Sequence, residues 1–219
     1  MSEHRTSGKL SIVATPIGNL EDITLRALRV LKEADIVACE DTRMTRKLLS
    51  HFDIKTPAVN LKQIQKFLEQ DKHVALVSDA GTPGVSDPGL ELVSRAREMG
   101  TQIETIPGAS SLTAALSVAG LRAPSFVFYG FLPQKKGREK LFTTIGREER
   151  ASIFFESPHR IMKTLASLEA HVPPDRRIGL FRELTKIYEE HLIGTAHELL
   201  QTLTEDKQRG EFVVIVEGT

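Results

Sequence analysis

A loop rich in glycine and proline is the part of this chain best suited to hold a ligand. It covers residues 78–89, Ser-Asp-Ala-Gly-Thr-Pro-Gly-Val-Ser-Asp-Pro-Gly, and it follows the apolar run Val-Ala-Leu-Val at 74–77. Glycine lets a ligand approach the main chain closely, and proline restricts the loop before the ligand arrives. A plain connection needs only about 2–6 residues, so this longer loop is expected to bind a small molecule through main-chain groups.

Other chemistries have little support at this loop. No Gly-Lys-Ser/Thr follows it, Gly-x-Gly-x-x-Gly is absent from it, and the chain has no Gly-x-Ser-x-Gly hydrolase motif. The seven histidines are scattered, and no Cys/His pair has the spacing of metal ligands. Asp79 and Asp87 could bind a cation, but Asp87-Pro88 is also a common turn, so we expect no metal.

Three further loops are expected beside this one. Each follows an apolar run: Thr-Pro-Ile-Gly-Asn at 15–19, Glu-Asp-Thr-Arg-Met-Thr-Arg at 40–46, and Pro-Gly-Ala-Ser-Ser at 107–111. Any one of them alone is also compatible with an ordinary turn. Right-handed crossovers bring the carboxyl ends of parallel strands to one edge of a sheet, where ligands bind. The four loops together predict a small-molecule site, without identifying the ligand.

Alternating strands and helices must position these loops. Apolar runs predict strands at 10–14, 36–39, 58–60, 74–77 and 103–106. Helical spacing predicts helices around 25–31, 42–50, 64–68 and 90–99, the first capped by Asp22 or Thr24. This alternation predicts a parallel, doubly wound sheet that is covered on both faces.

The second half of the chain follows a different pattern. A small-residue helix at 110–119 precedes apolar strands at 125–129, 153–155, 178–181, 188–193 and 212–216, with helices at 161–170 and 196–203. Some of these strands follow one another without a helix, which predicts a mixed sheet. We therefore expect two α/β domains, 1–112 and 113–219, with the ligand cleft between them.

Composition is that of an ordinary soluble globular protein. The 219 residues are 40% hydrophobic and 26% charged, with 29 basic and 29 acidic side chains. Zero net charge argues against a nucleic-acid coat protein but allows a local basic patch. A single cysteine, Cys39, suits a reducing cytoplasm, and no apolar run approaches the ~20 residues of a membrane span. Residues 1–9 lack the apolar centre of a signal peptide.

Seven motifs, in order, resemble one known family. They are Ala-Thr-Pro-Ile-Gly-Asn-Leu at 14–20, Glu-Asp-Thr-Arg at 40–43, the loop at 78–89, Pro-Gly at 107–108, Gly-Phe-Leu-Pro at 130–133, Glu-Ser-Pro-His-Arg at 156–160 and Arg-Glu-Leu-Thr-Lys at 182–186. Together they resemble the ribosomal RNA small-subunit methyltransferase I family of the tetrapyrrole-methylase superfamily, over about residues 10–218. Each motif alone is weak, but the ordered set is specific.

The resemblance implies both a reaction and its components. It implies that S-adenosylmethionine (SAM) donates a methyl group to a cytidine 2′-hydroxyl in the decoding region of 16S rRNA. It also implies a cytoplasmic homodimer that acts on 16S rRNA or the small ribosomal subunit, with no membrane partner. By the same resemblance, the residues expected to contact SAM, mainly through main-chain groups, are Pro16, Asp79, Gly81, Thr82, Pro83, Val85, Ser86, Ser110, Ser111, Glu156 and Thr185.

A ribose hydroxyl is a poor nucleophile, so a general base is expected beside it. Glu40 and Asp41 are the candidates, because they follow a predicted strand at the ligand edge. Their alternative role is to cap the next helix and interact with its dipole. Lys186 is expected to orient the hydroxyl or a phosphate, and its alternative is an ordinary solvated lysine.

Clustered basic residues are expected to bind the RNA. Local positive charge contacts phosphates and makes binding dependent on salt, although basic runs are often only solvated surface. The candidates are Arg43, Arg46, Lys47, Lys135, Lys136, Arg138, His159 and Arg160.

One stretch departs from the family pattern. The family usually has a His- and Glu-rich loop after the third strand, whereas here Asn60-Leu61-Lys62 runs directly into the next helix. We expect that a segment has been left out rather than deleted. Two consecutive Cα atoms between Val59 and Gln63 would then be separated by more than the ~3.8 Å of a trans peptide.

Two alternative functions stay open. A methyltransferase acting on a carbon atom of a tetrapyrrole is the nearest, although the basic clusters argue against it. A non-enzymatic RNA- or ribosome-binding protein on the same fold is the other, and it predicts no SAM binding.

Overall fold

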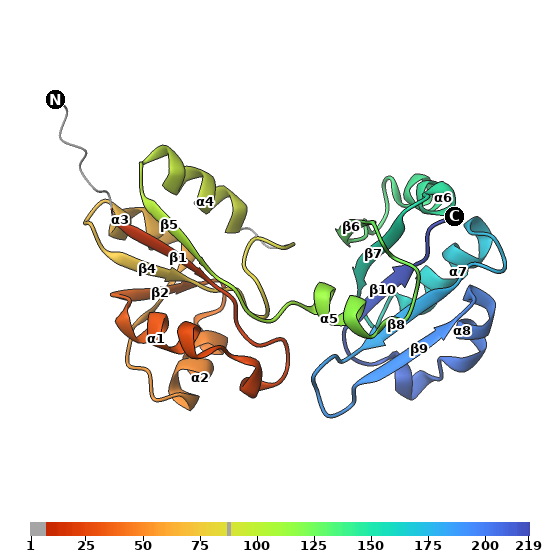
Figure 1. Cartoon of the computed structure of the whole chain (residues 1–219), viewed down its shortest axis with the longest axis horizontal. Helices are drawn as coiled ribbons and strands as arrows, with labels where there is room; N and C mark the ends of the chain where they lie inside the picture. Colours follow the sequence, from red (N-terminus) through yellow and green to blue (C-terminus); the bar gives the residue numbers. More distant parts are fainter. Residues whose placement is uncertain (1–7, 87–88) are drawn as a thin grey trace. The chain divides into compact units, whose positions relative to one another are not determined.

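The computed structural model describes residues 8–86 and 89–219, which form two compact units, Met1–Ser110 and Ser111–Thr219. Each unit is an α/β domain, described below by itself (Figure 1). The predicted fold class is confirmed, because the first sheet is parallel and the second is mixed. Within the described residues, no helix is long and apolar enough to span a membrane.

The first unit is built on a parallel five-stranded sheet with the order β3-β2-β4-β1-β5. Its strands are β1 (Lys9–Val13), β2 (Ile36–Cys39), β3 (Ala58–Asn60), β4 (His73–Leu76) and β5 (Gln102–Ile106). β1 lies between β4 and β5, with Lys9 opposite His73 on one side and Gln102 on the other. The central strands are almost continuously buried, as expected for a sheet covered on both faces.

Helices cover both faces of this sheet (Figure 1). They are α1 (Leu25–Glu33), α2 (Thr42–His51), α3 (Ile64–Leu68) and α4 (Gly89–Glu98), with short 3-10 helices η1 (Leu20–Asp22) and η2 (Leu61–Gln63). Leu31 of α1 and Leu49 of α2 pack into one apolar core, and Leu68 of α3 and Ala96 of α4 pack into the other. The N-cap of α1 is Thr24, one of the two predicted caps.

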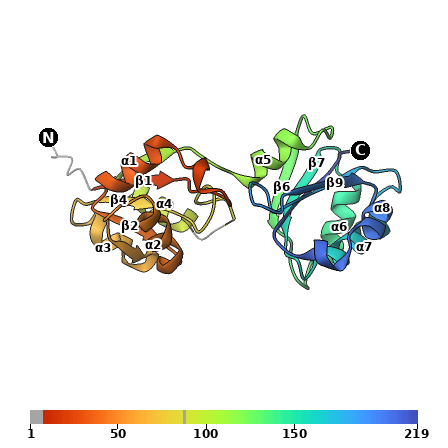
Figure 2. The same ribbon diagram turned by 90° about the horizontal axis from the view of Figure 1, so that it is seen from below.

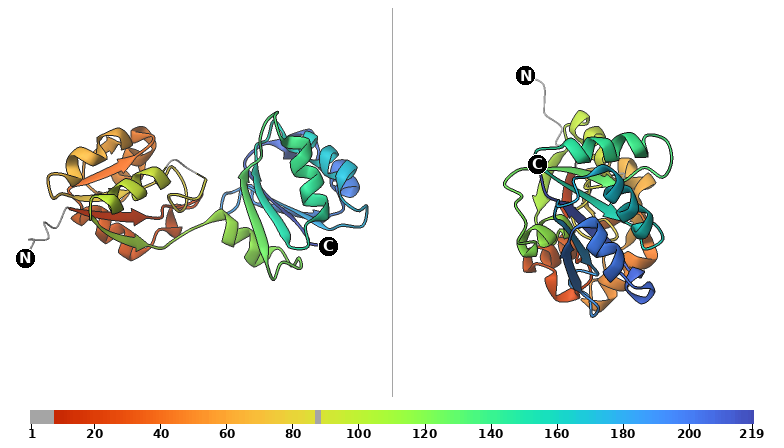
Figure 3. Two further views of the ribbon diagram at one scale, coloured as in Figure 1. Left: turned by 90° about the horizontal axis from the view of Figure 1, so that it is seen from above. Right: turned by 90° about the vertical axis from the view of Figure 1, so that its right-hand side faces the viewer.

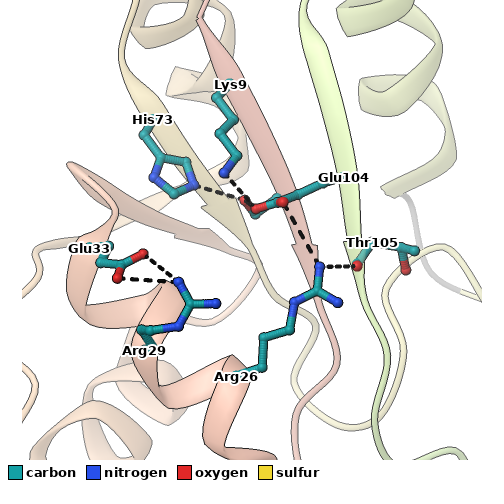
Figure 4. Close-up of polar contacts among 8 residues, drawn as sticks. Lys9, Arg26, Arg29, Glu33, His73, Glu104 and Thr105 are labelled. Atoms are coloured by element: carbon teal, nitrogen blue, oxygen red, sulfur yellow. Dashed lines mark hydrogen bonds and ion pairs between the residues drawn. The ribbon is translucent and has the colours of Figure 1, made fainter.

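A polar cluster crosses the first sheet near the amino ends of its strands. Ser11 Oγ donates to Glu104 Oε1 at 2.7 Å and lies 2.8 Å from His73 Nε2, while Lys9 Nζ lies 2.8 Å from Glu104. Lys9 and Arg26 point toward the Glu104 carboxylate in Figure 4, where Arg26 also donates to the Thr105 carbonyl. The cluster joins β4, β1 and β5 at the end of the sheet opposite the predicted ligand loops.

The second unit contains the mixed five-stranded sheet, with the order β6-β7-β10-β8-β9. Its strands are β6 (Phe126–Phe131), β7 (Ala151–Glu156), β8 (Ile178–Arg182), β9 (Glu190–Gly194) and β10 (Phe212–Val216). β6 and β7 are parallel, and the other neighbours are antiparallel. β8 and β9 form a hairpin, which is the direct strand-to-strand connection that predicted a mixed sheet.

Three helices of this unit cover the same face of its sheet. α6 (Arg138–Arg147), α7 (Ile161–His171) and α8 (Ala196–Thr202) gather on one side, whereas α5 (Ser111–Val118) lies on the other (Figures 2 and 3). One apolar core contains Phe142 of α6, Leu165 of α7 and Leu199 of α8. These side chains pack there with residues of β7, β8 and β10. A last 3-10 helix, η3 (Glu205–Gln208), precedes β10.

Helix α6 was not predicted from the sequence. It starts after Gly137, which has a φ of +84° and no side-chain capping bond. Its buried residues are Arg138, Phe142 and Ile145, so a charged residue occupies the first core position. Because an arginine stands at one of the buried positions, the sequence lacks the regular spacing of apolar residues that predicts a helix.

The chain passes directly from β3 to η2, and the expected omission of a segment there stays a prediction. Asn60 ends β3 and accepts a hydrogen bond from the Lys62 amide at 3.1 Å, which caps η2 directly. Ile64 then begins α3 with helical dihedral angles.

Candidate cofactor and RNA site

Hydrogen bonds join the loops that follow β1, β4 and β5. Thr15 and Gly81 exchange main-chain hydrogen bonds of 2.9 and 3.1 Å and form an antiparallel bridge. Thr15 Oγ1 also donates to the Ser78 carbonyl, and Thr82 Oγ1 donates to the Ala109 carbonyl, both at 3.2 Å. Three of the four predicted ligand loops are thus held together at the carboxyl edge of the first sheet.

Gly81 lies at the centre of this arrangement. Its φ of +76° belongs to the left-handed region that favours glycine. A Cβ atom there would lie 3.2 Å from Ile17 Cγ2 and 3.6 Å from the Ala109 carbonyl oxygen. Close approach of three loops therefore explains why the chain has glycine at this position.

The loop after β2 joins the same edge. The Asp41 amide donates to Asp79 Oδ1 at 3.4 Å, and Asn60 Nδ2 donates to the Glu40 carbonyl at 3.4 Å. Both contacts link the ends of neighbouring strands. Asp79 and Glu40 keep exposed side chains there.

The two candidate bases have different surroundings. Asp41 caps α2, accepts a hydrogen bond from the Arg43 amide at 2.8 Å and pairs with the Arg43 guanidinium at 2.9 Å. The hydrogen bond with the Arg43 side chain is the largest cause that lowers the pKa of Asp41 to about 2. Such a carboxylate is a weak base at neutral pH. The alternative role as a helix cap is what the structure shows for Asp41, so Glu40 is the better candidate.

Strained backbone marks two of the predicted cofactor loops. Ser86, Glu183 and Thr185 have φ values of +76°, +50° and +68°, which residues with a side chain rarely adopt. Such conformations gather at binding sites. The Thr185 hydroxyl is also buried without a hydrogen-bond partner among the described residues, as are Arg138 Nε and Ser152 Oγ, and of the three only Thr185 belongs to an expected cofactor contact.

Lys186 belongs to an ionic network on the same loop. Its ammonium lies 2.8 Å from Glu183 Oε1 and 2.9 Å from Glu211 Oε2. Partial burial acts to lower the pKa of Lys186, but the hydrogen bonds to Glu183 and Glu211 outweigh it and the pKa is raised. Lys186 is therefore a charged donor and not a base. Nothing in the sequence singles out Glu211, which is 25 residues from Lys186.

Glu156 was expected to contact the cofactor, with main-chain groups making most of the contacts, and its side chain is engaged within the second unit. Its carboxylate is fully buried. Oε1 accepts from the Ser157 amide at 2.7 Å and pairs with Arg160 Nε at 2.8 Å, while Oε2 accepts from Thr164 Oγ1 at 2.6 Å. All these partners belong to the second unit, and together they engage both carboxylate oxygens.

Arg138 was expected to contact RNA, and the structure corrects this. The residue is only 4% exposed and its guanidinium donates to Thr164 Oγ1 at 2.6 Å. It also lies over the Phe142 ring, 4.9 Å from the centroid. Burial in these contacts removes it from the surface that a phosphate could reach.

The remaining basic candidates lie at the surface. Lys135, Lys136 and His159 are exposed on the second unit, and Arg160 is half-buried. On the first unit, Arg46 and Lys47 are exposed on α2, whereas Arg43 is paired with Asp41. Exposed basic candidates thus lie on both units.

A metal centre is not seen in the parts of the chain that the structure describes. No group of three or more His, Cys, Asp or Glu side chains there could hold an ion. Asp87, one of the two possible cation ligands, lies outside the described residues.

Comparison with known proteins places this chain in a family. The family model for Tetrapyrrole (Corrin/Porphyrin) Methylases matches residues 9–200. The chain belongs to the tetrapyrrole methylase family. Its relatives include proteins named ribosomal RNA small subunit methyltransferase I, from Thermotoga maritima (41% identical over 96% of this chain and 99% of the relative) and Halalkalibacterium halodurans (47% identical over 96% and 76%). The resemblance carried by the seven motifs is thereby confirmed.

Solved structures share the tetrapyrrole methylase fold. Uroporphyrin-III-C-methyltransferase from Thermus thermophilus matches 95% of this chain and 94% of its own, with a TM-score of 0.69 and 23% identity. The cobalt precorrin-4 methyltransferase CbiF covers the same shares, with a TM-score of 0.71 and 17% identity. At these identities the likeness shows the fold alone.

The alignments also indicate that the relatives have residues that this chain lacks. The Thermotoga maritima alignment spans 220 residues yet covers 96% of a 219-residue chain. It must therefore contain positions that are empty in this tetrapyrrole methylase. The direct connection from β3 to η2 is the place where the family motifs led us to expect them.

Proposed function

We propose that this tetrapyrrole methylase transfers the methyl group of SAM to the 2′-hydroxyl of a cytidine in the decoding region of 16S rRNA. The observation that carries the proposal is the 41–47% identity, over at least 96% of the chain, to proteins named ribosomal RNA small subunit methyltransferase I. Exposed basic residues on both units agree with an RNA substrate. We also propose that the enzyme acts as a cytoplasmic homodimer.

Residues of the joined loops fit the binding of SAM. The bridge between Thr15 and Gly81 brings main-chain groups together at a point where a Cβ atom is excluded. Thr185 offers a buried hydroxyl that lacks a partner among the described residues. When bound, SAM supplies an activated methyl group on a sulfonium, so the protein chiefly has to position the acceptor hydroxyl.

Charged residues of the chain then have separate tasks. Glu40 accepts the proton of the ribose hydroxyl, a task for which Asp41 is disfavoured by its low pKa. Lys186 stays protonated, because Glu183 and Glu211 raise its pKa, and it donates to an oxygen of the nucleotide. The exposed lysines contact phosphates and orient the RNA.

Methyl transfer to isolated 30S subunits tests the proposal. Subunits and naked 16S rRNA from a strain that lacks the modification are incubated with radiolabelled SAM, and the labelled nucleotide is mapped. We expect label on one cytidine ribose. Label on a tetrapyrrole in a parallel reaction, with none on RNA, would instead support the carbon methyltransferase, and the absence of SAM binding in calorimetry would support a non-enzymatic RNA-binding protein.

A further inference from the structure

A buried ionic cluster lies directly beneath an exposed loop that carries two lysines. The Glu156 cluster consists of Glu156, Arg138, Arg160 and Thr164. The lysine loop, residues 133–137, connects β6 to α6 and is exposed throughout, including Lys135 and Lys136. It is bounded by two buried residues, Leu132 at 2% and Arg138 at 4% exposure.

The two arginines of the cluster hold neighbouring carbonyl groups at the base of this loop. Arg160 Nη1 donates to the Leu132 carbonyl at 3.0 Å, and Arg138 Nη1 donates to the Pro133 carbonyl at 3.1 Å. Glu156 is the group that they share, since it pairs with Arg160 Nε at 2.8 Å and with Arg138 Nη2 at 3.7 Å. One buried carboxylate thus aligns both donors.

The loop contributes little to its own rigidity. The Arg138 amide donates to the Lys135 carbonyl at 3.3 Å, and Gly137 has a φ of +84° with no heavy atom within 4 Å of the position of a Cβ. At its end the Gly137 carbonyl accepts a hydrogen bond from the Leu141 amide at 3.0 Å, and at its start the two guanidinium groups hold the main chain. Buried ion pairs are weak evidence for stability, because desolvation offsets their attraction, but they can fix one conformation.

We propose that Glu156 is a positioning residue for RNA: through Arg138 and Arg160 it fixes the lysine loop so that Lys135 and Lys136 meet two phosphates of the substrate. The inference rests on the proposed function. In this proposal, the Glu-Ser-Pro-His-Arg motif at 156–160 fixes the conformation of the RNA-binding loop. In this arrangement Arg160 acts on the RNA through the loop and does not contact a phosphate itself.

A double-mutant cycle separates these two roles of Arg160. Binding of a 16S rRNA transcript is measured for wild type, Arg160→Gln, the pair Lys135→Ala/Lys136→Ala, and all three changes together. We expect the lysine pair to lower RNA affinity about tenfold and to reduce the salt slope by roughly 1.5, as expected for two lost phosphate contacts. Arg160→Gln should lower affinity about threefold to tenfold in the wild-type background but less than twofold without the lysines.

Controls distinguish positioning from loss of charge or folding. Arg150→Gln removes one exposed cation that pairs with Glu148 beyond the last residue of α6, and it should leave RNA affinity within twofold. In Arg160→Gln, amides of the lysine loop should exchange hydrogen faster while SAM affinity stays unchanged. Glu156→Gln should behave like Arg160→Gln, and if it does not fold, the partly exposed Arg160 still provides the test.

The outcomes are distinct. An equal loss of affinity from Arg160→Gln in both backgrounds would mean that Arg160 contacts RNA directly, and no loss in either would mean that the loop needs no support; each overturns the inference. If the wild-type enzyme methylates 30S subunits in those cases, the proposed function stands. A wild type that neither binds nor methylates rRNA removes the proposed function as well.

Discussion

Thr15 and Gly81 are bound to each other through both of their main-chain groups, although they belong to loops after different strands. The bridge draws the loop after β4 across the end of β1, where Ile17 and Ala109 close around Gly81. The shape of the ligand edge therefore depends on a residue without a side chain.

Replacement of Gly81 by Ala tests this dependence. Left-handed backbone costs a residue with a side chain about 1–2 kcal/mol, and Gly81→Ala also forces its Cβ against Ile17 at 3.2 Å. Gly100→Ala is the matched control, since its φ is +73° and its Cβ would meet nothing within 4 Å. Gly100→Ala should lose about 1–2 kcal/mol in chemical unfolding and Gly81→Ala at least as much, but only Gly81→Ala should lower SAM affinity, by about tenfold in calorimetry. Equal SAM binding by the two variants would contradict the role given to Gly81.

Thr185→Val should weaken SAM binding without destabilising the protein. Valine keeps the shape and the backbone strain of Thr185 but removes a buried hydroxyl that has no partner among the described residues. Removal of an unpaired buried polar group is neutral or stabilising. Thr195→Val makes the same chemical change at the capping box of α8 and should cost about 1 kcal/mol with no effect on SAM. Thermal unfolding and SAM titration of both variants measure these effects. If Thr185→Val binds SAM as tightly as the wild type, the proposed contact of Thr185 with SAM is wrong.

Glu40→Gln and Asp41→Asn should show which of the two carboxylates is the general base and which only caps α2. A general base contributes about 10²–10⁴ to rate, so Glu40→Gln should lower kcat at least about 100-fold with little change in KM. Asparagine still caps a helix, so Asp41→Asn should reduce kcat less than about tenfold. Single-turnover methylation of 30S subunits measures both variants. A larger loss for Asp41→Asn would reverse the assignment.

His73 should make the stability of the first unit fall at mildly acidic pH. Burial is the main cause that lowers its pKa, aided by Lys9, while Glu104, Asp35 and Glu33 act to raise it. The fold thus favours the neutral ring, and its contribution is complete above the unfolded pKa of about 6.5 and is lost as pH falls below that value toward the lower folded pKa.

Melting temperatures between pH 7.5 and 5 measure this effect. His73→Gln keeps a hydrogen-bond donor toward Ser11, which itself donates to Glu104, but it cannot be protonated. We expect the wild type to lose more stability than His73→Gln as pH falls through this range. Parallel curves for the two proteins would show that other groups cause the dependence.

Much of the first unit could be predicted because its signals are local. The strand Ile36–Cys39 and the start of α1 at Thr24 follow from apolar runs and a capping side chain. The convergence of loops follows from the parallel topology. The bridge of Thr15 with Gly81 could not be predicted, because it depends on main-chain geometry between segments that are far apart in the sequence.

The second unit shows where the pattern misleads. Arg138 belongs by charge to the same basic run as Lys135 and Lys136, yet it occupies a core position of α6. Its charge is accommodated by Glu156 of β7, together with Thr164 and the Pro133 carbonyl. Burial of an ion depends on its partner in space, so sequence alone placed Arg138 on the RNA-binding surface, whereas the structure buries it.

The order of strands in the first sheet also determines when the first strand can pair during synthesis on the ribosome. Ser11 of β1 binds His73 and Glu104, which follow it by 62 and 93 residues. The first strand to be synthesised therefore has no neighbour until β4 and β5 have left the exit tunnel, and at 5–20 residues per second that wait lasts roughly 5–20 s. During that interval β1 is an unpaired apolar segment, so the nascent chain is most vulnerable to misassociation before the sheet closes around its earliest strand.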